Sequence, residues 1–171
     1  MNIRKLRSSI MEHEGRKIRP YIDPLVKTKI PKNELKIIEK HWSDLNITIG
    51  FGRNLQSNPL RSSEMMNMLD NDIKSIYDEL TDELENFGII IFVLPDNVQN
   101  VLVEMAYNMG VPRFMKFEKT LGFIKQNDYE SASVEMLDSS WWREHHRLDM
   151  LDGVDSIDRA EKLSNLMKGG N

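Results

Sequence analysis

The chain has 171 residues and a net charge of −4, and 40% of its residues are hydrophobic. That length suits one domain with a sizeable core, and that apolar fraction excludes general disorder. There are no cysteines, which excludes disulfides and thiolate chemistry, and no lysine–arginine block marks the chain as a nucleic-acid binder.

Two features argue against export by a signal peptide and against stable insertion in a membrane. The N-terminus "MNIRKLRSSIMEHEG" has basic residues but lacks the apolar segment of a signal peptide. The longest apolar run, "FGIIIFVLP", is too short to cross a bilayer. We therefore expect neither a leader nor a membrane anchor.

The first third of the chain predicts helix, then loop or strand, then helix. Apolar residues at helical spacing over residues 2–13 predict an amphipathic helix that ends at Gly15. The next segment, residues 16–31, contains three prolines and favours strand or loop. Asn33 can cap a helix that reaches about Trp42.

The sequence in the middle of the chain predicts a strand that makes a turn and then a long helix. An apolar run follows, whose secondary structure is left open. "NITIGFGRNL" is typical of a strand that turns at Gly50 and Gly52. Ser62 or Ser63 can cap "EMMNMLDNDIKSIYDELTDEL", which has a helical apolar period. "IIIFVL" fits either a buried strand or part of a buried helix, and periodicity does not decide between them.

The rest of the chain reads as helices. Asp96 can cap an apolar helix that Gly110 stops. "FMKFEKTLGFIKQ" and "DYESASVEMLDSSWW" predict two more, and a last helix starts near Ser156 and ends at paired glycines. These elements predict an α+β fold that is mainly α, with a small part-β N-terminal lobe, a larger helical lobe and a cleft between them as the default site.

Several motifs occur in an order that points to one family. They are "IMEHEGRKIRPYID", "TIGFGRNL", "VLVEMAYNMG", "SASVEMLDSSWW" and "DRAEKL". The chain resembles the T-even-phage-type lysozymes, glycoside hydrolase family 24, over essentially its whole length. The resemblance implies one lysozyme-like domain over residues 1–171, with a β-containing lobe at about 15–58 and a helical lobe at about 59–171 that packs with the N-terminal helix.

Two insertions set the chain apart from the family pattern. Asp23 and Thr48 are 25 positions apart, much further than the family spacing, so residues 24–46 form an inserted segment. A second insertion covers residues 143–155. The first one extends the substrate groove or covers a sheet edge, and the sequence favours the structural role.

The resemblance implies a pair of carboxyl groups working on a glycosidic bond. Glu14 would be the general acid, a role that needs a raised pKa of the kind that partial burial supplies. Asp23 would stay ionised on the opposite side of the bond, and Thr48 would help hold the attacking water. Because the family inverts configuration, the two carboxyl groups should lie about 6.5–9.5 Å apart.

The resemblance also implies supporting and sugar-binding residues. Arg159 would pair with the catalytic Glu, and Trp141 would lie behind the cleft. Asn108 and Gly110 would close the cleft-lining helix, and Tyr21 would support the site beside Asp23. The positions that would contact the sugar chain are Asn54, Tyr107, Thr120 and Glu135.

Three further predictions concern charged and polar side chains. We expect an ion pair between Arg53 and Asp72. Glu104 stands where an asparagine is usual and, if it is buried, it needs a hydrogen-bond partner or a raised pKa. The histidines suggest no metal site and read as solvated side chains.

The sequence therefore predicts a monomeric enzyme that needs no cofactor and acts on the glycan strands of peptidoglycan. It would be a phage endolysin that stays in the bacterial cytoplasm until a holin-type pathway releases it. Lytic transglycosylase activity is an alternative that the presence of Asp23 and Thr48 disfavours. A virion- or tail-associated lysozyme, or a catalytically silent wall-binding protein, remain further alternatives.

Overall fold

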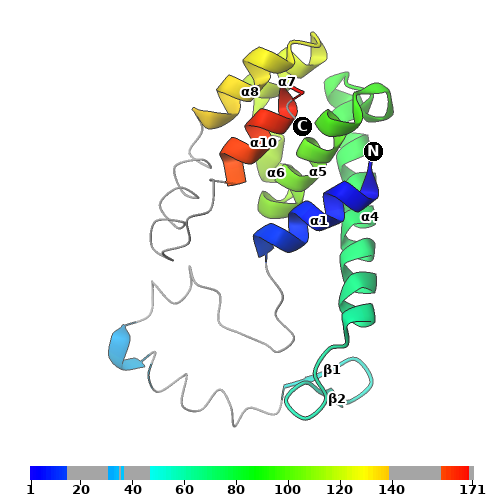
Figure 1. The fold of residues 1–171 in the computed structure, drawn as a ribbon, viewed down its shortest axis with the longest axis vertical. Coiled ribbons are helices and arrows are strands. Elements are labelled where there is room, and N and C mark those ends of the chain that lie inside the picture. The colour runs from blue at the N-terminus through cyan, green and yellow to red at the C-terminus, as the bar shows by residue number, and fades with distance from the viewer. Residues whose placement is uncertain (15–30, 35, 37–46, 139–158, 170–171) are drawn as a thin grey trace. The chain divides into compact units, whose positions relative to one another are not determined.

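A computed structural model describes residues 1–14, 31–34, 36, 47–138 and 159–169. The chain forms two compact units, one made of Met1–Glu14 with Asp70–Asn171 and the other made of Gly15–Leu69. The described residues are mainly helical and include one sheet of two strands. This agrees with the predicted mainly helical α+β class (Figure 1).

The unit Gly15–Leu69 contains the sheet, which is a short hairpin. Strands β1 (Thr48–Ile49) and β2 (Arg53–Asn54) pair antiparallel. Gly50 and Gly52 in the turn have φ angles of 54° and 86°, a backbone region that favours glycine. The predicted strand and its glycine turn are therefore confirmed, whereas the predicted helix from Asn33 is described only at residues 32–34 and 36, which are helical.

The other unit is helical. It contains α1 (Ile3–Glu14), η1 (Ile91–Val93), α5 (Asp96–Met109), α6 (Val111–Phe114), α7 (Glu118–Lys125), α8 (Tyr129–Leu137) and α10 (Arg159–Met167). A long helix, α4 (Ser62–Phe87), begins in the unit Gly15–Leu69 and continues into this one. Helix α5 is central, because α1, α6 and α10 all contact it, and α8 packs on both α7 and α10 (Figure 1).

The core of the helical unit follows the predicted apolar spacing. Every residue of α5 from Val98 to Ala106 is buried. On α1 the buried positions are Leu6 and Ile10, four residues apart and therefore on one face. Burial of one face of α1 against α5 explains why this short N-terminal helix forms.

The helix ends match most of the local signals in the sequence. Helix α4 begins at Ser62, and α1 ends at Glu14, one residue before the predicted stop. Asp128 caps α8 by accepting a hydrogen bond from the Ser131 N–H (3.0 Å). Gly110 ends α5 with a φ of 81°, as predicted.

Asp96 does not cap α5, contrary to the prediction. Pro95 occupies the cap position, and Asp96 is the first residue of the helix. The Asp96 carboxylate lies 2.7 Å from the N-terminal amine of Met1, so its oxygen is engaged by a charge rather than by the backbone of its own helix. The carboxylate still lies in the first turn, where a negative charge suits the helix dipole.

The run "IIIFVL" is neither strand nor part of a long helix. It forms the short 3-10 helix η1, in which Ile91 and Leu94 are buried while Phe92 and Val93 are exposed. Side chains three residues apart share one face of a 3-10 helix, which explains this pattern. Gly88 and Pro95 bound the run on its two sides.

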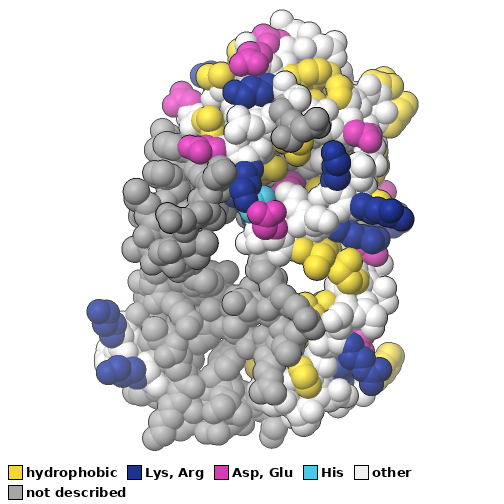
Figure 2. All heavy atoms as spheres, in the orientation of Figure 1, with side chains coloured by type: hydrophobic (Ala, Val, Ile, Leu, Met, Phe, Trp, Pro, Cys, Tyr) yellow, Lys and Arg dark blue, Asp and Glu magenta, His cyan; other side chains and the backbone are white. Residues whose placement is uncertain are grey.

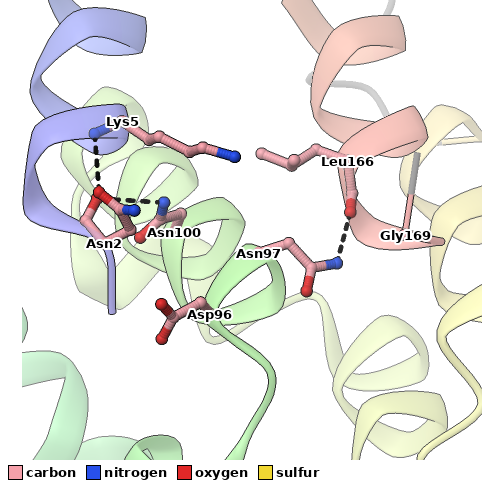
Figure 3. Close-up of a pocket in the computed structure, with 7 residues that line it drawn as sticks. All are labelled: Asn2, Lys5, Asp96, Asn97, Asn100, Leu166 and Gly169. Carbon is pink, nitrogen blue, oxygen red and sulfur yellow. Dashed lines mark hydrogen bonds between the residues drawn. The ribbon is translucent and has the colours of Figure 1, made fainter. Parts of the chain in front are cut away.

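A small pocket of about 280 Å³ lies among α1, α5 and α10 (Figure 3). The Asn97 side-chain amide donates to the Leu166 carbonyl (2.7 Å), and the Asn100 amide donates to the Asn2 carbonyl (3.3 Å). These amides join the ends of the three helices. No residue of the predicted catalytic or sugar-binding set lines this pocket.

Candidate functional site

The predicted acid lies at a helix end. Glu14 is the last residue of α1, as the sequence predicts. The Glu14 side chain, and the whole of Tyr21, Asp23 and Trp141, lie outside the described residues. Their predicted roles and the predicted separation of the two carboxyl groups therefore stay predictions.

The predicted water-binding residue lies on the hairpin. Thr48 is exposed on β1 and is the register partner of Asn54 on β2. The side-chain oxygen of Asn54 accepts hydrogen bonds from the backbone N–H groups of Gln56 (2.9 Å) and Ser57 (3.1 Å). Asn54 thus shapes the turn after β2 besides being a predicted sugar contact.

Arg53 pairs with Glu64, so the prediction that Asp72 is its partner is wrong. The Arg53 guanidinium contacts the Glu64 carboxylate and also donates to the carbonyls of Asn58 (3.0 Å) and Pro59. Glu64 lies in the first turn of α4, directly after the loop that this guanidinium holds. Asp72 is eight residues further along the helix, a rise of about 12 Å.

The Glu64 carboxylate has a second partner at the helix start. It accepts a hydrogen bond from the Arg61 backbone N–H at 2.7 Å, as the third residue of a helix does in a capping box. The hydrogen bond from Arg53, with that from Arg61, holds the pKa of Glu64 below its usual value. The carboxylate thus joins the hairpin to the first turn of α4.

Two predicted residues lie at the C-terminal end of α5. Tyr107 and Asn108 are half-buried in its last turn. The Gly110 N–H donates to the Ala106 carbonyl (2.8 Å), which closes that turn. These positions agree with the expected end of a helix, and the proposed sugar contact of Tyr107 stays a prediction.

The other two predicted sugar contacts lie on α7 and α8. Thr120 is 1% exposed, so a sugar could reach its side chain only if neighbouring groups moved. The Glu135 carboxylate is half-buried and lies 3.5 Å from the Lys119 ammonium. The proposed contacts of Thr120 and Glu135 with a sugar chain stay predictions.

Glu104 is the centre of a buried polar cluster, which we call the Glu104 cluster and define as His13, Glu104 and Arg159. Glu104 is 1% exposed on α5, and its Oε1 atom lies 2.6 Å from Nδ1 of His13. The same oxygen lies 3.5 Å from Nε of Arg159, which is 8% exposed on α10. The expectation that a buried Glu104 needs a hydrogen-bond partner is confirmed.

His13 is the residue that sequence reasoning missed. It was expected to be solvated, but its side chain is 9% exposed and pairs with Glu104. One signal was its spacing, because His13 follows Leu6 by seven residues and Ile10 by three and therefore shares the buried face of α1. A second signal lay in its partner, because an acidic residue in the middle of an apolar helix requires a donor on a neighbouring helix.

Charged side chains lie beside a histidine on one face of the helical unit. Figure 2 shows a histidine side chain beside basic and acidic ones, and His13 is the histidine among the described residues. The Lys162 ammonium lies 2.6 Å from the Glu12 carboxylate, which holds the pKa of Glu12 below its usual value. Helix α10 therefore contacts the last turn of α1 through this pair as well.

Comparison with known proteins points to one family. The chain is 24% identical over 151 residues to a protein from Dictyostelium discoideum named "Probable T4-type lysozyme 2", a match that covers 81% of this chain and 85% of that relative. No protein-family profile matches the chain. The chain is thus distantly homologous to a T4-type lysozyme. It is therefore a lysozyme-type glycoside hydrolase, and the resemblance drawn from its motifs is confirmed.

Two further properties concern the described residues. None of the described helices is both long and apolar enough to cross a bilayer. Within the described part of the chain, no three His, Asp or Glu side chains gather as metal ligands would. The carboxyl chemistry of a glycoside hydrolase needs no metal ion.

Proposed function

We propose that this T4-type lysozyme hydrolyses the β-1,4 bond between N-acetylmuramic acid and N-acetylglucosamine in bacterial peptidoglycan. The observation that carries the proposal is the similarity to a T4-type lysozyme over 81% of the chain. Glu14 at the end of α1 and Thr48 on β1 support it, because both stand on the elements that the motifs lead us to expect.

In this mechanism the bond breaks in a single displacement. The Glu14 carboxyl group gives its proton to the leaving glycosidic oxygen. A water held by Thr48 attacks the sugar carbon from the opposite face and loses its proton to Asp23. The products are two shorter glycan strands, and the configuration at the attacked carbon is inverted.

The biological setting that we propose is lysis of a bacterial host by a phage. The endolysin would stay in the host cytoplasm and reach the wall through a holin-type release. A relative in Dictyostelium discoideum means that T4-type lysozymes are not confined to phages, so the setting needs its own test. Recovery of the chain in purified virions would favour a tail-associated lysozyme instead.

The first prediction concerns the acid. Glu14→Gln keeps the size of the side chain but has no proton to give, so we expect the rate of wall hydrolysis to fall by about 10²- to 10⁴-fold. The measurement is the loss of turbidity of outer-membrane-permeabilised cells. Equal lysis by the parent and the variant would disprove the assignment of the acid.

The products of the same digest distinguish the enzyme classes. A hydrolase leaves reducing N-acetylmuramic acid ends, because water enters the bond. A lytic transglycosylase leaves anhydro-muramic ends, and a silent wall-binding protein leaves none. Mass spectrometry of purified peptidoglycan after digestion separates the three outcomes.

A further inference from the structure

The Glu104 cluster places an ionisable group where the core of the helical unit is most apolar. Glu104 stands among buried neighbours along α5, so its charge needs both a counter-charge and hydrogen bonds. Arg159 supplies the counter-charge at 3.5 Å, and His13 supplies a hydrogen bond at 2.6 Å. Both contacts fall on the same oxygen, Oε1.

The hydrogen bond to His13 has a definite direction. A 2.6 Å contact between Nδ1 and Oε1 requires a proton between the two atoms. The other ring nitrogen, Nε2, is buried and makes no hydrogen bond with the described residues, so a proton there would be left unpaired. We therefore assign the ring proton to Nδ1, which donates it to the carboxylate of Glu104.

This hydrogen bond fixes the last turn of α1 to the centre of the unit. His13 and Glu14 are consecutive residues, so any movement of His13 moves the backbone that carries Glu14. The pair is buried, so water does not compete for the contact. The nearby Lys162–Glu12 pair also contacts this turn, but Glu12 is 64% exposed, and an exposed ion pair adds little.

We propose that His13 and Glu104 are positioning residues for the general acid, holding the end of α1 through one buried hydrogen bond so that Glu14 meets the glycosidic oxygen. This inference rests on the proposed function, because it assumes that Glu14 gives the proton. Neither residue touches the substrate. A displacement of about 1 Å of a reacting group costs on the order of 100-fold in rate, so a single contact of this kind matters.

The test compares variants of His13 that differ in one donor. His13→Asn keeps an N–H group near the position of Nδ1, whereas His13→Leu keeps the bulk and removes the donor. We expect His13→Leu to lose about 100-fold in the rate of reducing-end release from purified peptidoglycan. We expect His13→Asn to restore most of that loss, a rescue that a purely apolar packing role would not give.

Binding is measured beside the rate. The fraction of protein that co-sediments with purified peptidoglycan should stay the same in His13→Leu, because the hydrogen bond acts on the acid and not on the sugar contacts. Glu12→Gln is the matched control, since it breaks an exposed contact of the same turn and should keep the parent rate. A parent-like rate in His13→Leu would overturn the proposal.

A second variant is needed if the loss of the His13 hydrogen bond from buried Glu104 prevents the chain from folding. The double variant His13→Leu with Glu104→Gln removes that hydrogen bond and the buried carboxylate, while the new amide oxygen can still accept a hydrogen bond from Arg159. It should fold and still lose about 100-fold in rate. A folded double variant with the parent rate would refute the positioning role.

Glu14→Gln separates failure of this inference from failure of the proposed function. If Glu14→Gln is inactive and His13→Leu is fully active, only the positioning role falls. If Glu14→Gln keeps the parent rate, the assignment of the acid falls, and the positioning role falls with it.

Discussion

The Glu64 carboxylate links strand β2 to the start of helix α4. It accepts a hydrogen bond from the side chain of Arg53 on β2 and from the backbone N–H of Arg61, just before α4. These contacts favour the ionised form and hold its pKa below the usual value. Ionised Glu64 therefore stabilises the folded state more than it stabilises the unfolded chain.

Glu64→Gln should lower the melting temperature at neutral pH. A lowered folded-state pKa gives a stabilisation that is fully present above the unfolded pKa of about 4.3 and is lost as the pH falls through the folded-state value. The difference between parent and variant should thus shrink in acid. Melting curves between about pH 3 and pH 7 measure this difference in melting temperature. A difference that stays constant over this pH range would contradict a stabilising role of the ionised Glu64 carboxylate.

Partners of charged residues were the hardest feature to predict from the sequence. The prediction for Arg53 took Asp72 from the family resemblance and missed Glu64, because the resemblance does not reveal how the loop before α4 folds back. The need of Glu104 for a partner could be predicted from its apolar surroundings. That the partner is His13, 91 residues away, required the packing of α1 on α5.

At the scale of the elements, α1 is held by apolar burial more than by charge. Leu6 is fully buried, whereas the Arg7–Asp70 pair, at 2.7 Å, has side chains that are 32% and 36% exposed. Burial of a leucine side chain outweighs a half-exposed ion pair by several-fold in free energy. The two contributions can be separated by substitution.

Leu6→Ala should reduce the free energy of unfolding by about 2–5 kcal/mol, and Asp70→Asn should reduce it by less than about 1 kcal/mol. Denaturation in urea, followed by circular dichroism, measures both. The ion-pair difference should also decrease in high salt, while the leucine difference should remain. A larger loss for Asp70→Asn than for Leu6→Ala would mean that charge holds the helix.

The helices could largely be predicted because their ends carry local signals. Gly110 ends α5, and α4 begins at Ser62, within one residue of the predicted cap position, although Ser62 is its first helical residue. The failures lie where a non-local contact decides the structure or where the apolar pattern leaves two structures open. Asp96 is engaged by the N-terminal amine of Met1, and "IIIFVL" is confined between Gly88 and Pro95.

The hairpin that carries Thr48 was predictable for a similar reason. The two glycines and the alternating β-branched residues around Thr48 specify a turn locally, and the strand pairing follows. The roles of the site residues came from resemblance to a family and not from spacing. Thr120 illustrates the limit, since its burial depends on how α7 packs.

At the scale of the whole molecule, the net charge of −4 sets an expectation for salt. The bacterial wall is anionic, so this lysozyme gains no overall attraction to it. We expect the rate of wall hydrolysis not to fall as sodium chloride rises from about 0.01 to 0.15 M, over which the screening length drops from about 30 to 8 Å. Clearing of permeabilised cells measures the rate.

A variant in which two acidic side chains become basic provides the control for the salt experiment. Glu79→Lys with Glu83→Lys adds positive charge at exposed positions of α4. It should clear cells faster than the parent at low salt and at the same rate at high salt. A steep loss of the parent rate with salt would mean that a local basic surface guides it to the wall.

The contacts of α1 have a consequence for how the chain is made. Its partners lie far along the chain, from 63 residues for Arg7–Asp70 to 150 residues for Lys162–Glu12. At about 5–20 residues per second, on the order of 10 s separates the synthesis of α1 from that of α10. The apolar face of α1 packs on α5, and Glu104 of α5 is made 91 residues after His13, so this face also lacks its partner for several seconds after α1 is made. Helix α1 is therefore the first helix of its unit to be made and is completed only when these later helices pack on it.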